Sequence, residues 1–199
     1  VIMKQYMQFK GFTLIELMVT LAVAAIIMTV AVPSFNSLIR DNRLTVQNNE
    51  LVSTLLVARS EAVKRSTTVT VCASSDQATC NTTNWEAGWI VFADFNADRV
   101  VDAGTNSCAV GEDCILFSGN AFNDGNTLRA SLFSNAGFVQ YTAQGTIDSP
   151  GTFTTCDSRG TSKAKAANVN AMGRVSKATD SDADNIPNNN SGSNVSCPS

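Results

Sequence analysis

The sequence predicts an α+β protein: a long N-terminal α-helix, membrane-spanning and then amphipathic, packs on an antiparallel β-sheet domain that disulfides stabilise. Three observations predict this fold. An apolar run fills residues 12–32, and a helical hydrophobic pattern continues to about residue 66. After residue 67 the pattern changes to short β-branched and aromatic runs, and all six cysteines lie in this later part.

The apolar run predicts a membrane-spanning helix. As a helix, the segment from Phe12 to Val32 measures about 32 Å, which is enough to cross a bilayer core. A secretory signal would have a shorter apolar core with no carboxylate inside it, whereas this run contains Glu16. Lys4 and Lys10 precede the run and keep that end cytoplasmic by the positive-inside rule. A carboxylate in a membrane costs several kcal/mol unless it is paired, so Glu16 is predicted to be functional.

Residues 33–66 predict an amphipathic continuation of the helix. Pro33 closes the apolar run and lacks a backbone N–H, so it is expected to bend the helix. Beyond it, apolar residues recur three, four or seven positions apart, at Leu44, Leu51, Leu55, Ala58 and Ala62. Such a stripe is typical of a helix face that packs on a globular domain, and we expect that role rather than a partner-binding groove.

Residues 67–199 predict a β-rich globular domain with a polar C-terminal tail. No long helical pattern follows Arg65. Turn-forming residues separate the candidate strands at short intervals. The candidate strands are 68–72, 88–92, 114–117, 128–133, 137–141, 151–156, 167–170 and 173–177.

The cysteines predict structural disulfides. Zinc sites usually mix cysteine with histidine or use C-x-x-C pairs, and the sequence has neither. An even number of cysteines in a polar domain fits disulfides formed in an oxidising compartment, although the sequence allows many pairings. Short spacings favour Cys72–Cys80 and Cys108–Cys114. Cys156 would then join Cys197 and hold down the polar tail, which is not expected to pack by itself.

The segment Lys10-Gly11-Phe12-Thr13-Leu14-Ile15-Glu16 resembles the prepilin signature of type IV pilins and type II secretion pseudopilins. The resemblance implies that residues 1–11 are a leader peptide, cleaved after Gly11 by a prepilin peptidase. It also implies N-methylation of Phe12, by a peptidase that is also an N-methyltransferase. Residues 12–32 would be the transmembrane and assembly helix, in which Glu16 pairs with the Phe12 amine of a neighbouring subunit.

Later segments narrow the resemblance. Residues 71–74, 88–94 and 171–175 resemble minor pilins of the FimU/FimT type and the related H-type pseudopilins. This implies a minor pilin that helps initiate type IV pili and joins them at or near the tip, with other major and minor pilins as partners. The subunit would cross the inner membrane once before assembly and then lie in the extracellular pilus, its globular domain periplasmic or extracellular. Cys156, Asp157, Arg159, Gly160 and Cys197 favour the pilus over the H-type pseudopilin alternative.

DNA uptake is an alternative function, because FimT-type pilins are implicated in it through a C-terminal Gly-Arg-x-Arg motif. Gly173 and Arg174 match this motif, but Ser176 occupies the second arginine position and Lys177 follows it. On a strand, Lys177 would face away from Arg174. The net charge of −3 argues against general nucleic-acid binding. A solvated polar surface is the competing interpretation. The candidate DNA-binding residues are Arg159, Lys163, Lys165, Arg174 and Lys177.

The sequence predicts no enzyme, no cofactor and no metal. It has no histidine, no G-x-S-x-G motif and no obvious acid/base pair. Two acidic stretches are calcium candidates, although Arg99 stands where a calcium loop needs glycine and no glutamate follows at the twelfth position. Hydrophilic turns are the competing interpretation of both stretches. The candidate ligands are Asp94, Asn96 and Asp98 in the first and Asp180, Asp182 and Asp184 in the second.

Overall fold

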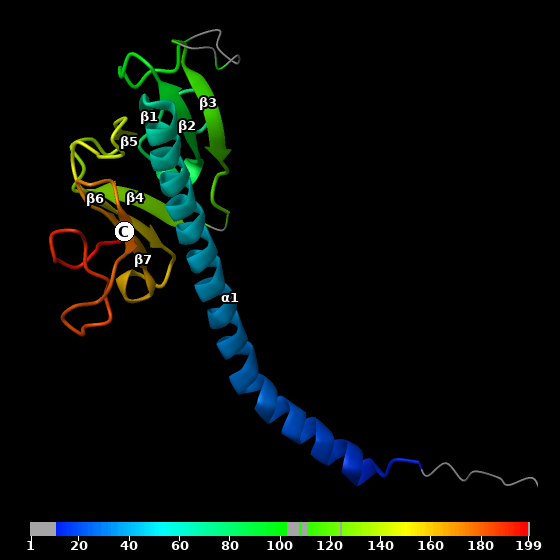
Figure 1. Cartoon of the computed structure of the whole chain (residues 1–199). Helices are drawn as coiled ribbons and strands as arrows, with labels where there is room; N and C mark the ends of the chain where they lie inside the picture. The colour runs from blue at the N-terminus through cyan, green and yellow to red at the C-terminus, as the bar shows by residue number, and fades with distance from the viewer. Residues whose placement is uncertain (1–10, 103–107, 109–110, 124, 199) are drawn as a thin grey trace, which may run out of the picture. The chain divides into compact units, whose positions relative to one another are not determined.

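The computed structural model describes residues 11–102, 108, 111–123 and 125–198 (Figure 1). The chain divides into two compact units, Val1–Asp41 and Asn42–Ser199. The helices are α1 (Leu14–Arg65) and the 3₁₀ turns η1 (Trp85–Ala87) and η2 (Thr161–Lys163). The strands are β1 (Thr68–Ala73), β2 (Trp89–Asp94), β3 (Cys114–Gly119), β4 (Thr127–Ser131), β5 (Phe138–Tyr141), β6 (Gly151–Cys156), β7 (Lys165–Val169) and β8 (Val175–Lys177).

In the first unit, α1 presents its apolar side chains to the surroundings. Its most apolar window has a mean hydropathy of 2.4, and none of that window is buried within the protein. By length and composition the helix can cross a membrane. The Thr20 and Thr29 hydroxyls donate hydrogen bonds to Leu17 O and Ile26 O, so these polar groups are satisfied inside the helix. The helix also continues through Pro33 as one element.

In the second unit, the predicted apolar stripe of α1 faces the core. The side chains that recur at helical spacing are all fully buried, which confirms that this face packs on the globular domain. Full burial of each leucine contributes about 1.5–3 kcal/mol. The buried stripe consists of Leu44, Leu51, Leu55, Ala58 and Ala62.

The strands form two antiparallel four-stranded sheets, with the orders β3-β2-β1-β5 and β4-β6-β7-β8. All eight overlap the strands that the sequence predicts, although the pattern did not reveal that they form two sheets. In β1, Val69 and Val71 belong to the main core, while Cys72 belongs to a separate apolar cluster with Ile90 and Phe92. This alternation shows that both faces of the first sheet are covered.

Two tryptophans join the layers of the core. Trp85, in η1, packs edge-on against Phe153 of the second sheet, with 4.7 Å between ring centroids. Its indole N–H donates to Ala136 O at 2.7 Å. The indole N–H of Trp89 donates to Thr54 Oγ1 of α1 at 3.3 Å. The amphipathic rings therefore fill the core while their polar atoms remain hydrogen-bonded.

Disulfides close the chain segments that cover the outer faces of both sheets. The structure pairs Cys72 with Cys80, Cys108 with Cys114 and Cys156 with Cys197, which are the pairs that the spacing favours. Cys80 packs on the outer cluster of the first sheet. Val195 and Cys197 of the tail pack with Cys156 of the second sheet.

The polar tail packs by more than its disulfide, contrary to the expectation from its composition. Asn188 is buried, and its side-chain amide donates to Gly192 O at 3.2 Å and Asn194 Oδ1 at 3.1 Å. Its side-chain oxygen accepts from the backbone N–H and hydroxyl of Ser181. In addition, Asn168 of β7 donates to Asn188 O. The buried Asn188 thus links three segments, β7, the loop at Ser181 and residues 192–194, because a buried polar group needs hydrogen-bond partners close to it.

Candidate functional sites

The candidate assembly site lies at the start of α1. A Cβ added at Gly11 would meet nothing within 4 Å beyond its chain neighbours, and the Phe12 side chain is 76% exposed. The Glu16 backbone N–H donates to Thr13 Oγ1, a side-chain cap of the helix start. Glu16 itself is exposed, and within the described residues no cation pairs with it. The leader residues 1–10, including Lys4 and Lys10, lie outside the described residues.

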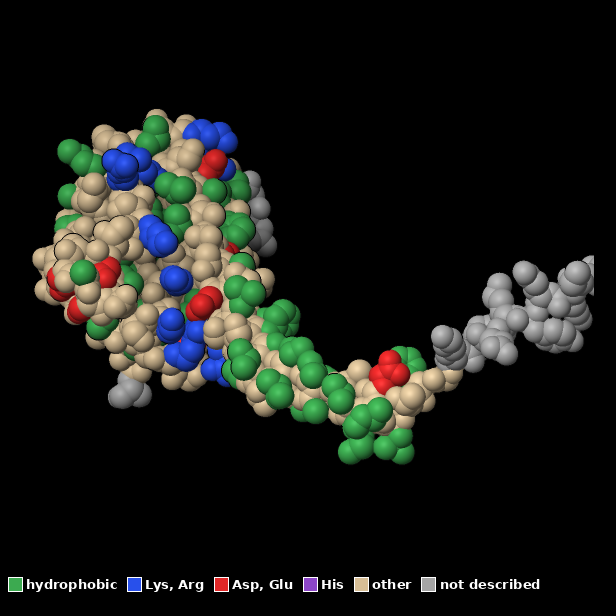
Figure 2. Space-filling model, turned by 90° about the horizontal axis from the view of Figure 1, so that it is seen from below, with side chains coloured by type: hydrophobic (Ala, Val, Ile, Leu, Met, Phe, Trp, Pro, Cys, Tyr) green, Lys and Arg blue, Asp and Glu red, His purple; other side chains and the backbone are tan. Residues whose placement is uncertain are grey.

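The candidate DNA-binding residues differ in their exposure and in whether an acidic side chain compensates their charge. Arg159 is mostly buried and lies against Asp157, with Nη2 2.7 Å from Oδ2, so its charge is locally compensated. Lys163, Arg174 and Lys177 are exposed, and Lys165 is half-buried. Figure 2 shows the Lys and Arg side chains on the visible face of the globular unit as separate groups, with acidic side chains beside some of them.

Of Arg174 and Lys177, only Lys177 lines a polar hollow. Arg174 directly precedes β8 instead of lying in it, and its backbone N–H donates to Asn170 Oδ1 at 3.0 Å. Lys177 lines a polar pocket of about 340 Å³ with asparagine, serine and threonine side chains. The amides of Asn168 and Asn188 already donate within the protein. The hydroxyls of Ser176 and Thr179 and the Lys177 ammonium are donors that suit a phosphate oxygen or another polar acceptor. The other lining residues are Asn168, Ser176, Thr179, Ser181, Asn188, Asn189, Asn190 and Gly192.

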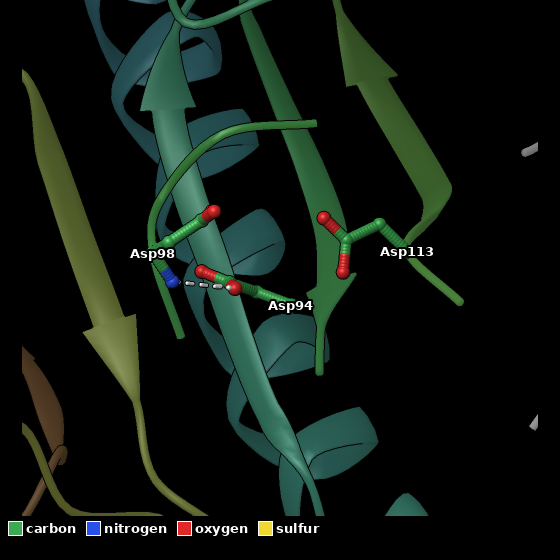
Figure 3. A group of neighbouring side chains, drawn as sticks. All are labelled: Asp94, Asp98 and Asp113. Atoms are coloured by element: carbon green, nitrogen blue, oxygen red, sulfur yellow. Dashed lines mark hydrogen bonds between the residues drawn. The ribbon is translucent and has the colours of Figure 1, made fainter. Parts of the chain in front are cut away.

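The first acidic stretch forms a three-carboxylate cluster that differs from the predicted set. Asp94 ends β2, Asp98 follows in the loop and Asp113 directly precedes β3 (Figure 3). One oxygen from each carboxylate lies within 4.8 Å of the others. The pairing of Ala93 with Cys114 brings Asp113 to the end of β2, which spacing along the chain could not reveal. Asn96 instead donates its amide to Asp98 Oδ2 at 3.0 Å.

These carboxylates hold the β2–β3 loop. Asp94 is fully buried and accepts hydrogen bonds from the Thr70 hydroxyl at 2.7 Å and from the backbone N–H of Asp98 at 3.1 Å. Asp113 accepts from the backbone N–H groups of Phe95 and Asp102. Desolvation and the nearby charge of Asp113 raise the pKa of Asp102. The cluster could offer oxygens to a cation, but its hydrogen bonds already account for its geometry, so calcium binding here stays a prediction.

The second acidic stretch is an exposed loop built around Asp180. Its Oδ1 accepts from the backbone N–H groups of residues 182–184, and its Oδ2 accepts from Asn185 N at 2.8 Å. Desolvation opposes ionisation of Asp180, but these N–H groups outweigh it and lower its pKa. A hydrogen bond with Asp180 raises the pKa of Asp182. Asp184 completes the cluster within 4.8 Å, and calcium binding here also stays a prediction.

Comparison with known families decides the class of the chain. Residues 47–173, more than half of the sequence, match the family described as Type II transport protein GspH. The chain belongs to the GspH family. Residues 6–32 of this GspH-family chain also match the family described as Prokaryotic N-terminal methylation motif. The second match covers Gly11, Phe12 and Glu16, the residues that carry the prepilin resemblance.

Three solved structures are similar to this GspH-family chain, one of them with a TM-score above 0.5. The type IV minor pilin FimU of Pseudomonas aeruginosa PAO1 matches with 22% identity and a TM-score of 0.51, over 69% of this chain and 90% of that one. A second crystal form of FimU matches with 21% identity and a TM-score of 0.49, over 68% of this chain and 92% of that one. The minor pseudopilin EpsH of Vibrio cholerae matches with 11% identity and a TM-score of 0.42, over 68% of this chain and 95% of that one. Comparison with curated proteins gives no match.

The GspH-family chain is therefore a non-enzymatic pilin or pseudopilin subunit, of the kind found in type IV pili or type II secretion. Such a subunit assembles with other pilins. Its apolar N-terminal helix and methylation motif fit anchoring in a membrane before assembly. The sequence prediction of a pilin-like α+β fold, without enzymatic activity, agrees with these findings.

Proposed function

We propose that the chain is a minor pilin that helps initiate type IV pili and is incorporated at or near the pilus tip. The observation that carries the proposal is Glu16, a carboxylate without a cationic partner among the described residues, in an exposed apolar helix that follows a prepilin-type cleavage motif. A carboxylate in hydrocarbon is costly until a cation reaches it. A neighbouring subunit that brings its N-terminal amine to Glu16 removes this cost, so assembly becomes favourable in the membrane.

The proposed maturation has a defined order. Prepilin peptidase removes residues 1–11 on the cytoplasmic side, and the new Phe12 amine is methylated. Residues 12–32 then hold the subunit in the inner membrane in a single pass. The amphipathic segment 33–66 continues into the globular domain, residues 67–199, which lies in the periplasm and later outside the cell on the pilus.

Substitution of Glu16 tests the assembly role. Glu16→Ala should leave cleavage and folding intact but lower incorporation into sheared pili by about 10- to 100-fold, since a charge-assisted hydrogen bond contributes about 1.5–3 kcal/mol. Thr20→Ala is the matched control, because it removes a polar group from the same helix that is already satisfied internally. Immunoblots of pili and membranes measure both variants. Incorporation of the Glu16 variant at the wild-type level would refute the pairing role.

A second candidate function is DNA capture for natural transformation, and the polar pocket beside Lys177 favours it. Because Asp157 compensates Arg159, we expect four cations, Lys163, Lys165, Arg174 and Lys177, to contact phosphates. The slope of log affinity against log salt should then be no steeper than about −3.6 for duplex DNA. Binding should be weak and independent of sequence, because phosphate contacts do not read bases.

Mobility shifts of the purified full-length chain, run across salt concentrations, test the DNA hypothesis. Arg174→Ala should weaken binding to all sequences alike. Lys64→Ala is the control, because Lys64 is an exposed cation already paired with Glu61. A chain that binds no DNA at low salt, or binds equally well without Arg174, would leave only the structural role. Recovery of the chain in a type II secretion pseudopilus instead of a pilus would favour the H-type pseudopilin alternative.

A further inference from the structure

Strand β3 is an open edge of the first sheet. It pairs with β2 on one side, and no described strand pairs with its other side (Figure 1). Its sequence, Cys-Ile-Leu-Phe-Ser-Gly, contains no charge and no proline. Soluble proteins usually protect an edge with lysine, proline, a β-bulge or a covering segment, because its unpaired backbone groups recruit other strands. Of these protections the described part of β3 has only a bulge, so its apolar edge favours a surface that another chain covers.

A β-bulge in β3 turns an aromatic ring toward α1. Val91 pairs with Phe117 and Phe92 pairs with Ile115, so Leu116 is an extra residue in β3. Leu116 packs against the main core, while Phe117 stays 43% exposed. Bulges at sheet edges commonly redirect a side chain, and here the redirected side chain lies where the edge meets the helix.

An apolar slot of about 210 Å³ lies between this edge and α1. Its walls are Glu50, Ser53, Thr54 and Val57 of the helix and Phe117 of β3. Val57 is 49% exposed although it is apolar. Among the described residues, Glu50 has no cationic partner at the rim of the slot. The slot therefore offers an apolar floor with one negative charge beside it.

We propose that the β3 edge and this slot receive an extended strand of a neighbouring pilin-type subunit that is not a second copy of this chain. The strand pairs its backbone with β3, places one apolar side chain in the slot and brings a lysine or arginine to Glu50. An open row of backbone N–H and C=O groups selects an extended chain, and a pocket beside it selects a side chain, which is the mode of β-strand addition. This inference rests on the proposed function as a pilus subunit.

The position of the slot identifies the occupant as another subunit. One wall of the slot is α1, the helix whose N-terminal part carries the assembly motif. A neighbour that assembles through the start of α1 belongs to the same filament, and its strand is the extended chain most available to the slot. A small molecule could fill the slot, but it would leave the β3 backbone unpaired and would not account for the uncharged edge.

Photo-crosslinking in the native host tests the proposal on the full-length chain. A photoreactive phenylalanine analogue at position 117 should crosslink to an extended segment of another pilin-type subunit, identified by mass spectrometry. The same analogue at Met172, which is 67% exposed in the β7–β8 turn, is the control and should give no such adduct. Phe117→Lys should lower incorporation into pili at least tenfold, whereas Met172→Lys should not. Thermal unfolding of both lysine variants establishes that they fold.

Each alternative result has a distinct meaning. A crosslink from position 117 to a second copy of this chain, or to a protein that is not a pilin, would overturn the proposed occupant. Absence of an adduct, or normal incorporation of the folded Phe117→Lys variant, would overturn the site. Failure of the proposed function looks different, because the wild-type chain itself would then be absent from pili.

Discussion

Removal of the Cys156–Cys197 disulfide should cost more stability than removal of either other disulfide. Its cysteines are 41 residues apart, whereas Cys108 and Cys114 are 6 residues apart. In the chain-entropy model, the long loop gives about 3.9 kcal/mol at 25 °C and the short one about 2.2 kcal/mol. The double variant Cys156→Ser/Cys197→Ser should therefore lose about 1.7 kcal/mol more free energy of unfolding than Cys108→Ser/Cys114→Ser.

Denaturation of the full-length protein in detergent, followed by tryptophan fluorescence, measures this difference. Trp85 and Trp89 are fully buried in the globular unit, so both report its unfolding. Both variants replace two disulfide-bonded cysteines and leave no unpaired cysteine, so the two variants differ in the length and position of the opened loop. If the Cys156/Cys197 variant loses no more stability than the control, loop entropy does not explain how this disulfide acts.

The same double variant should make the tail after Lys177 sensitive to proteases. The buried Asn188 amide still holds part of the tail, so the additional change Asn188→Ala should increase cleavage further. Limited proteolysis with mass mapping of the fragments measures both effects. Cleavage in residues 178–198 that does not change when Asn188 is replaced would show that the amide does not hold the tail.

Two further predictions concern the globular unit. Desolvation opposes ionisation of Glu86, but hydrogen bonds from Arg129 and from the backbone N–H of Leu128 outweigh it and lower the pKa of Glu86. The substitution Glu86→Gln should therefore lower the free energy of unfolding by about 1 kcal/mol at pH 7. The stability difference between the two proteins is present above pH 4.5 and is lost as the pH falls through the folded-state pKa of Glu86. Denaturation at pH 7 and pH 3 measures it, and an equal difference at both pH values would contradict the prediction. Gly173→Ala should lower thermal stability far more than Gly160→Ala. Both glycines have positive φ, but only at position 173 would the new Cβ lie 2.1 Å from Gly145 O. Equal losses of thermal stability in the two variants would contradict this steric argument.

The fold could be predicted because its signals are local. The apolar stripe of α1 and the β-branched runs each reflect burial of one face, so helix and strands fall within a few residues of the expected bounds. The separation into two sheets was not predictable, because it depends on which strands pair across long intervals. Turn η1, around Trp85, was also missed, since a single helical turn has no periodicity to detect.

The candidate sites were predictable only where neighbouring residues form them. Asp180, Asp182 and Asp184 come together because one loop carries all three. Asp113 joins Asp94 only through the β2–β3 pairing, and no spacing along the chain indicates it. The slot beside Phe117 depends on a bulge and on a helix from a distant part of the chain. Compensation of Arg159 by Asp157 was visible in the sequence as two charges two residues apart, but its burial was not.

The positions of the disulfides imply an order of events during folding. The main core between α1 and the sheets, as far as the described residues form it, contains no cysteine, so it can form while every thiol is still reduced. Disulfides fasten the covers over Ile90 and Phe92 on one sheet and over Ala166 on the other, so these covers are fully held only after oxidation. A subunit that docks its helix before oxidation would keep its main core but expose apolar strands to proteases. Oxidation would thus determine how long a subunit withstands proteases before it joins a filament.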